Sequence, residues 1–296
     1  MSRVLTKSEL DRVSGLPSRS AAKYLGVGKS TINKYRALYH TLPDDENANP
    51  RILTIDIESK PLTVYTWGLF NQNIGINQIK ENGGMICVAY KWLGEATTGF
   101  LSDFHDGHEN MVREVHKLLS EADIVITYNG DRYDFKRLNN EFLELRMGPP
   151  KPYKSIDLIK TNRAQFDLPS RKLDYLAQFV GEGEKNKHSG MDLWVRCFEQ
   201  NDPEAWEEMR EYNLQDVKLT ERLYTRLLPW LKHVPHAAMF AGGGTLCPYC
   251  GSKALVRDGE YHTLNQTYAL YCCDTCEGWS RGTQRLADSV KTREAR

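Results

Sequence analysis

The middle of the chain alternates between short apolar runs and segments whose apolar residues recur at helical spacing. RILTIDIE (51–58) is a β-branched run typical of a buried strand. Further strands are expected at TVYTWGLF (63–70), MICVAYKWL (85–93), TTGFLSD (97–103) and DIVITYNG (123–130). Helices are expected at 108–122, from Tyr133 onward, at 172–180 and from 203 to 231. Hairpin strands followed by a β-α-β crossover predict an α/β fold, with a mixed sheet flanked by helices.

The pattern changes toward both ends of the chain, which predicts two small modules around a central domain. Residues 1–40 are expected to be helical, and 41–50 form a linker rich in Pro, Asn and Asp. Residues 51–240 hold strands and helices without a break long enough to divide them. AGGGT (241–245) is expected to be a joint, and 246–296 a cysteine-bearing module with a charged tail.

Charge and hydropathy exclude a membrane-spanning class and leave the partner open. The 296 residues hold 39 Lys and Arg against 39 Asp and Glu, so the net charge favours no partner. Residues 1–36 differ, with eight basic and two acidic residues. Every apolar run is far shorter than the roughly 20 residues of a membrane span. We therefore expect a soluble, intracellular protein of the cytoplasm with no membrane contact.

Three short motifs carry carboxylates that could act together. Asp56 and Glu58 are two apart on the first strand, so their side chains point to the same face. Asp134 follows a strand and a turn at the start of a helix, where a carboxylate is also an ordinary capping group. Tyr212 and Asp216 are four apart and share one face of a helix. Each motif alone is weak evidence, because each also has an ordinary structural explanation.

The order of these motifs resembles the tyrosine-bearing branch of the DEDD 3′–5′ exonuclease superfamily. YNGDRYDF (128–135) is similar to the second motif of the proofreading domains of B-family DNA polymerases. SRKLDYLAQFVGEGEK (170–185) is similar to the segment that precedes their third motif. The resemblance covers residues 51–231 and implies a ribonuclease H-like fold. Because the chain has no length left for an attached polymerase, we expect a stand-alone nuclease.

The resemblance also implies roles for the acidic residues. The expected ligands of two Mg²⁺ or Mn²⁺ ions are Asp56, Glu58, Asp134 and Asp216, with Asp56 as the bridge. Two such ions about 3.5–4 Å apart activate the attacking water and stabilise the leaving 3′-oxygen of a phosphodiester. Four carboxylates without His or Cys suit magnesium, which prefers oxygen ligands. Tyr212 would orient the water, because a phenol is too weak an acid to be a strong base at neutral pH.

Two residues close to Asp134 have open roles. Asn129 would contact the nucleic acid or fix the acidic cluster, or it would serve only as a turn residue. Tyr133 would pack in the core, which is the favoured interpretation, or stack on a terminal base.

The cysteines near the end of the chain predict a structural zinc site. CPYC and CCDTC form two pairs separated by about twenty residues, a spacing typical of zinc ribbons. The expected ligands of one Zn²⁺ are Cys247, Cys250, Cys273 and Cys276, with Cys272 as an alternative third ligand. Four thiolates leave no open position on the metal, so this zinc would be structural. The aromatic residues of the module would contact nucleic acid or form its small core.

The segment LPSRSAAKYLGVGKSTINKYRALY (16–39) resembles the DNA-binding helix-turn-helix group. An alanine-rich helix, Gly26 at a turn and a second helix near Ser30 have the spacing expected of that motif. The residues expected to face the major groove or its phosphates are Lys29, Ser30, Thr31, Asn33 and Lys34. The alternative is a helical protein-interaction domain.

These features together predict a metal-dependent exonuclease that removes nucleoside monophosphates from single-stranded 3′ ends of DNA. The expected protein partners are replication or recombination proteins. The alternatives are an RNA exonuclease or structure-specific endonuclease with the same acids, and a non-catalytic DNA-binding regulator. The complete acidic set argues against the regulator, since a decayed site should have lost ligands. Small joined modules are associated with proteins of phage or mobile-element DNA metabolism, an association that no residue of the chain supports directly.

Overall fold

The computed structural model describes residues 9–10, 12–13, 16, 18–33, 50–185, 189–240 and 244–286. The chain divides into two compact units. One is Arg51–Leu223, and the other comprises the described residues on both sides of it. The finer division into an N-terminal module, a linker, a central domain and a C-terminal module stays a prediction.

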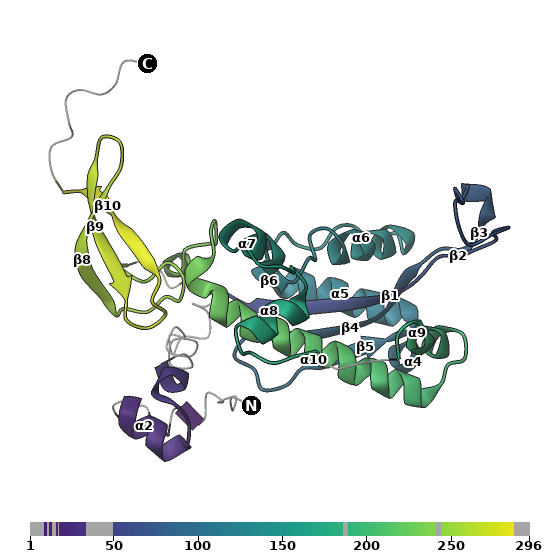
Figure 1. Cartoon of the computed structure of the whole chain (residues 1–296), viewed down its shortest axis with the longest axis horizontal. Helices are drawn as coiled ribbons and strands as arrows, with labels where there is room; N and C mark the ends of the chain where they lie inside the picture. The colour runs from purple at the N-terminus through teal and green to yellow at the C-terminus, as the bar shows by residue number, and fades with distance from the viewer. Residues whose placement is uncertain are drawn as a thin grey trace. The chain divides into compact units, whose positions relative to one another are not determined.

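A five-stranded mixed sheet forms the centre of the unit Arg51–Leu223 (Figure 1). Its strands are β1 (Ile52–Lys60), β4 (Gly84–Trp92), β5 (Gly99–Ser102), β6 (Ile124–Thr127) and β7 (Lys154–Asp157). They lie in the order β5-β4-β1-β6-β7. β1 runs antiparallel to β4 and parallel to β6, and β6 is parallel to β7. The predicted mixed sheet is confirmed, and the strand that carries Asp56 and Glu58 lies at its centre.

Helices cover both faces of this sheet, as predicted. They are α4 (Asp103–Asp106), α5 (His108–Glu121), α6 (Asp134–Glu144), α7 (Leu158–Gln165), α8 (Leu173–Phe179), α9 (Met191–Phe198) and α10 (Pro203–Leu227). Ile55 and Ile57 of β1 pack with residues of α5 and α6 in one core cluster. Ile86 and Cys87 of β4 pack with residues of α9 and α10 in another. No helix in the described ranges has the length and apolar character needed to cross a membrane.

The strand predicted at 63–70 is wrong over most of its length. The structure has only β2 (Thr63–Val64), which pairs with β3 (Ile79–Glu81) outside the main sheet. The side chains of Trp67 and Phe70 are exposed to solvent. An apolar run resembles a buried strand whether or not a core covers it, and in the part of the chain that the structure describes nothing buries Trp67 and Phe70.

Strand β7 was not predicted from the sequence. It lies at the edge of the sheet, and only its last two residues, Ile156 and Asp157, are buried. Lys154 and Ser155 precede them, so the segment lacks the apolar run that indicates a strand.

The described residues outside Arg51–Leu223 include elements of both predicted small modules. Near the C-terminus, β8 (Leu255–His262), β9 (Thr267–Cys273) and β10 (Trp279–Arg285) form a three-stranded antiparallel sheet. Near the N-terminus, α2 (Ser18–Leu25) and a helical stretch at 29–33 flank Gly26. Gly26 has a φ of +67°, which a glycine adopts without strain. Ala22, Leu25 and Ile32 share a small buried cluster, and Tyr35 lies outside the described residues.

Candidate active site

Alternation along β1 places two carboxylates on the face of the sheet that α10 covers. Ile55 and Ile57 point into the core beneath α5 and α6, so Asp56 and Glu58 point the other way. Glu58 lies opposite Cys87 of β4, whose side chain packs against α9 and α10. Burial of two acids on a central strand is unfavourable unless a cation compensates for their charge.

Helix α10 adds a third carboxylate to this pair. Single oxygen atoms of Asp56, Glu58 and Asp216 all lie within 4.8 Å of one another. Asp216 is buried, and Tyr212 lies one helical turn before it. The structure therefore brings together three of the four predicted acidic ligands, from a strand and a helix that are far apart in the sequence.

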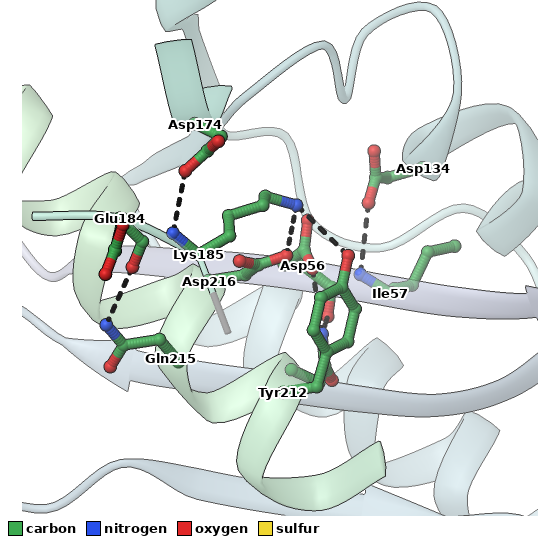
Figure 2. A network of polar contacts seen from close by, with 10 residues as sticks. Asp56, Ile57, Asp134, Asp174, Glu184, Lys185, Tyr212, Gln215 and Asp216 are labelled. Carbon is green, nitrogen blue, oxygen red and sulfur yellow. Dashed lines mark hydrogen bonds and ion pairs between the residues drawn. The ribbon is translucent and has the colours of Figure 1, made fainter. Parts of the chain in front are cut away.

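The fourth acid, Asp134, approaches the cluster from a different side. It opens α6, and its Oδ1 accepts a hydrogen bond of 3.1 Å from the backbone N–H of Ile57, between Asp56 and Glu58 (Figure 2). Its oxygens are not among the three that lie within 4.8 Å of one another. Its negative charge nonetheless raises the pKa of Asp56, so the two carboxylates are electrostatic neighbours.

Two residues of the site were not found by sequence reasoning. The amide Nδ2 of Asn213 donates to Asp56, at 2.8 Å to Oδ2 and 3.3 Å to the backbone oxygen. Asn213 is fully buried and follows Tyr212, so a polar residue on the core face of α10 was the available signal. Lys185 ends the segment 170–185, but nothing in its local sequence indicates which carboxylate it contacts.

Lys185 provides the positive charge of the cluster. Its Nζ lies 2.5 Å from Asp216 Oδ2 and donates a hydrogen bond of 3.1 Å to the Tyr212 hydroxyl (Figure 2). The backbone N–H of Lys185 donates to Asp174 Oδ1 at 2.8 Å, and Gln178 donates to the other oxygen of Asp174. Asp174 thus fixes the backbone from which the Lys185 side chain reaches the site.

Burial and mutual repulsion raise the pKa values of the clustered acids. Burial, followed by the charge of Asp216, raises the pKa of Glu58 to about 8. Burial raises the pKa of Asp134 to about 6, although the Ile57 amide opposes this. Burial and the neighbouring charge of Asp134 raise the pKa of Asp56 well above its usual value. Such shifts mean that bound cations would stabilise the ionised form of the cluster.

The two remaining polar groups are held in their ordinary protonation states. Burial and the charge of Asp216 raise the pKa of Tyr212 above its usual value, so the phenol keeps its proton at neutral pH. Burial alone would lower the pKa of Lys185, but Asp216 and Tyr212 raise it, so the amine stays charged. Tyr212 can therefore orient a water by hydrogen bonding, whereas it is poorly suited to remove a proton.

The donor set fits hard divalent cations. The four acids offer only oxygen ligands, and no His or Cys side chain contributes a ligand atom to the group of three. Magnesium and manganese prefer such ligands and keep several of their own waters. In the absence of a metal ion, Lys185 supplies one positive charge against the carboxylates.

Near α6, the structure shows Asn129 in a turn and Tyr133 on the surface. Asn129 has a φ of +73°, and its N–H donates to Asp157 Oδ1 at 2.7 Å, so it serves the turn. Contact of its side chain with nucleic acid stays a prediction. Tyr133 is exposed and its ring lies 4.4 Å from the Arg137 guanidinium, so packing in the core was wrong.

The cysteine cluster has the arrangement of a four-thiolate metal site. One sulfur each from Cys247, Cys250, Cys273 and Cys276 lies within 4.8 Å of the others. The sulfurs of Cys250 and Cys273 are 3.7 Å apart. Cys272 is not in this group, because adjacent residues on β9 point to opposite faces. Tetrahedral zinc suits this donor set, and it would leave no position for catalysis.

Four of the five predicted DNA contacts near the N-terminus lie in the short helical stretch 29–33. Lys29 and Ser30 are exposed, and Thr31 and Asn33 are partly buried. Lys34 lies outside the described residues. Their contact with a DNA groove stays a prediction.

Comparison with known proteins places the central domain in a family. Residues 53–228 match the profile of the family described as the RNase_H superfamily. Among solved structures, the family B DNA polymerase from the hyperthermophilic archaeon Pyrobaculum calidifontis is 16% identical, with a TM-score of 0.48. That match covers 75% of this chain and 33% of the polymerase chain, so this chain spans about a third of it. No curated protein matches. The family match confirms the ribonuclease H-like fold, the fold of the DEDD exonucleases, predicted from the order of the motifs.

Proposed function

The chain belongs to the RNase H superfamily, and from this membership we propose that it is a metal-dependent 3′–5′ exonuclease acting on single-stranded 3′ ends of DNA. Membership supports a nuclease activity in general. The specific proposal rests on one observation, the convergence of Asp56, Glu58 and Asp216 within 4.8 Å. Asp134 adds a fourth acid beside the backbone of Ile57.

Each residue of the cluster has a distinct role in this proposal. Asp56, Glu58, Asp134 and Asp216 would hold two divalent ions, and the resemblance to the DEDD exonucleases implies that Asp56 would contact both. Two bound ions supply activation of the attacking water and stabilisation of the leaving 3′-oxygen. Asn213 holds the Asp56 carboxylate through its Nδ2 amide. Tyr212 would orient the water, since its phenol stays protonated.

We propose that the four-cysteine cluster binds one structural Zn²⁺. Its role would be to fold the three-stranded sheet β8–β10, because small sheets have too little apolar core to be stable alone. The helical N-terminal residues and this sheet would hold the DNA, and replication or recombination proteins remain the proposed protein partners.

Strand-polarity digestion tests the proposed activity. Single-stranded DNA labelled at its 5′ end should shorten one nucleotide at a time in Mg²⁺, and DNA labelled at its 3′ end should release labelled mononucleotide at once. Asp56→Ala and Asp216→Ala should abolish both, whereas Glu207→Gln on the exposed face of α10 should not. Internal cuts, or wild-type activity of both alanine variants, would disprove the proposal. A matched RNA strand in parallel decides the sugar preference, because phosphate-binding acids cannot sense the 2′-hydroxyl.

A further inference from the structure

The loop between β2 and β3 exposes an unusual set of side chains. Residues 65–78, here called the aromatic loop, contain no charged residue. Trp67 is 99% exposed and Phe70 81% exposed. Its other exposed large apolar residues are Tyr65, Leu69, Ile74 and Ile76. Asn and Gln side chains occupy most of the remaining positions. A cluster of this kind on the surface of a protein marks an interaction site.

Hydrogen bonds within the aromatic loop define its shape and leave the rings pointing outward. The Tyr65 N–H donates to the Gln78 backbone oxygen at 2.8 Å. The Gln78 side chain donates to the Tyr65 backbone oxygen at 2.9 Å, and its Oε1 accepts from the Gly75 N–H at 2.8 Å. The Gln78 side chain and the backbone groups of Tyr65 and Gly75 are thus used inside the loop, and its large apolar side chains are exposed.

The aromatic loop continues directly from the strand that carries the candidate active site. β1 bears Asp56 and Glu58 and ends at Lys60, and β2 begins three residues later. The paired strands β2 and β3 extend beyond the end of β1 (Figure 1). A polymer whose end lies at the acids and which follows the direction of β1 would therefore reach this loop.

Cations lie at the base of the aromatic loop, together with the Lys80–Glu81 ion pair of β3, and its tip carries no charge. Lys60 ends β1. The Arg137 guanidinium lies close to Gly83, because a β-carbon built on this glycine would be 3.6 Å from Nη1 of Arg137. Arg137 also lies over the ring of Tyr133, the residue next to Asp134. Cations and one exposed ring therefore lie between the acids and the uncharged tip.

We propose that the aromatic loop binds the unpaired bases of a nucleic-acid strand whose 3′ end occupies the acidic site, an inference that rests on the proposed function. Aromatic rings stack on the face of every base, so the contact needs no particular sequence. Side-chain amides can pair with base edges, and an uncharged loop does not repel phosphates. Lys60 and Arg137 would contact the phosphates between the loop and the acids.

The test combines protein variants with base deletions. Binding of single-stranded DNA is measured without added Mg²⁺ or Mn²⁺, which keeps the strand intact and leaves the proposed zinc in place, for the wild type, Trp67→Ala and Phe70→Ala. Phe179→Ala on α8 is the matched control, since Phe179 is 65% exposed on a different element. Abasic sites are placed one or two at a time along the strand. Trp67→Ala should weaken binding about 5-fold or more on the intact strand, the scale of one lost base stack.

The abasic strands separate stacking from other effects. Where a base stacks on Trp67, its removal should weaken wild-type binding and leave the Trp67→Ala variant unaffected. The proposal would be overturned if each abasic site weakened DNA binding equally in the wild type and in Trp67→Ala. It would also be overturned if Trp67→Ala and Phe70→Ala both bound the intact strand as tightly as the wild type. So would a dimer of the wild type that dissociates in Trp67→Ala at the same concentration, since the loop would then cover a second copy of the chain. Cleavage assayed in parallel keeps the two proposals separate. If the wild type binds with this base dependence but does not cut DNA, the inference about the loop stands and the proposed exonuclease activity is wrong.

Discussion

The Nζ of Lys185 lies 2.5 Å from Oδ2 of Asp216, so the amine contacts one oxygen of a carboxylate that would also hold a metal ion. Asp216 is almost fully buried, and only 28% of the Lys185 side chain is exposed. Lys185 thus balances part of the negative charge of the cluster while no divalent ion is bound. A divalent ion that binds Asp216 through this oxygen must displace the amine.

Lys185→Ala should therefore make the stability of the protein depend on divalent ions. Loss of a hydrogen bond between charged groups costs about 1.5–3 kcal/mol of the free energy of unfolding, which lowers Tm in EDTA by about 5 °C in a domain of this size. Mg²⁺ should restore more stability to the variant than to the wild type. Thermal melts with and without Mg²⁺ measure both, with Lys172→Ala, an exposed lysine, as control. Equal Mg²⁺ effects in both proteins would contradict the role of Lys185.

Asp56→Asn should stabilise the metal-free protein while it destroys activity. The raised pKa of Asp56 means that its ionised form is unfavourable in the folded state at neutral pH. Removal of the charge therefore relieves the cost of its burial and its repulsion by Asp134. Asn213 can still donate to the amide oxygen of the new side chain. We expect a higher Tm in EDTA and a loss of cleavage of at least about 100-fold, since a metal ligand is removed. Asp192→Asn, at an exposed position of α9, should change neither. A lower Tm for Asp56→Asn would argue against electrostatic repulsion in the cluster.

The stability of the metal-free protein should fall as pH rises from about 4 to about 8. Glu58 and Asp134 have pKa values of about 8 and about 6, above their usual values of 4.5 and 3.8. The folded chain therefore holds more protons than the unfolded chain in this window, and each lost proton favours unfolding. Mg²⁺ binds the ionised acids, so its stabilising effect should grow over the same window. Urea unfolding in EDTA and in Mg²⁺ across this range measures both trends. Glu58→Gln should flatten the slope in EDTA, and an unchanged slope would mean that other groups control it.

Zinc content should distinguish Cys273 from its neighbour. The sulfur of Cys273 is 3.7 Å from that of Cys250, whereas Cys272 is outside the cluster. Purified wild type and Cys272→Ser should each contain one zinc per chain by elemental analysis, and Cys273→Ser should contain less. Zinc retained by Cys273→Ser but lost from Cys272→Ser would reverse the assignment.

Local patterns were sufficient to predict some parts of the site but not others. Alternation on a strand puts Asp56 beside Glu58 on one face, and helical spacing does the same for Tyr212 and Asp216. The contact of Lys185 with Asp216 joins residues 31 positions apart and has no local signature. Asn213 reaches Asp56 across 157 positions, so only the packed fold reveals it.

The fold shows the same difference between local and tertiary information. The central strands were predicted because their apolar runs are largely buried, on both faces in β6 and over Leu53–Ile55 in β1. The segment 63–70 has an equally apolar pattern, but most of it forms the exposed aromatic loop. Hydrophobic pattern alone cannot report whether another element covers a segment. That missing information separates a buried strand from an exposed loop.

Crystals grown with Mn²⁺ and measured at an anomalous wavelength test the central claim most directly, namely that four acids converge to hold a pair of cations. Two manganese peaks about 3.5–4 Å apart are expected, with oxygens of Asp56, Glu58, Asp134 and Asp216 as their protein ligands and the Lys185 amine moved away from Asp216. No manganese at these acids under saturating conditions, with Lys185 still bound to Asp216, would contradict it.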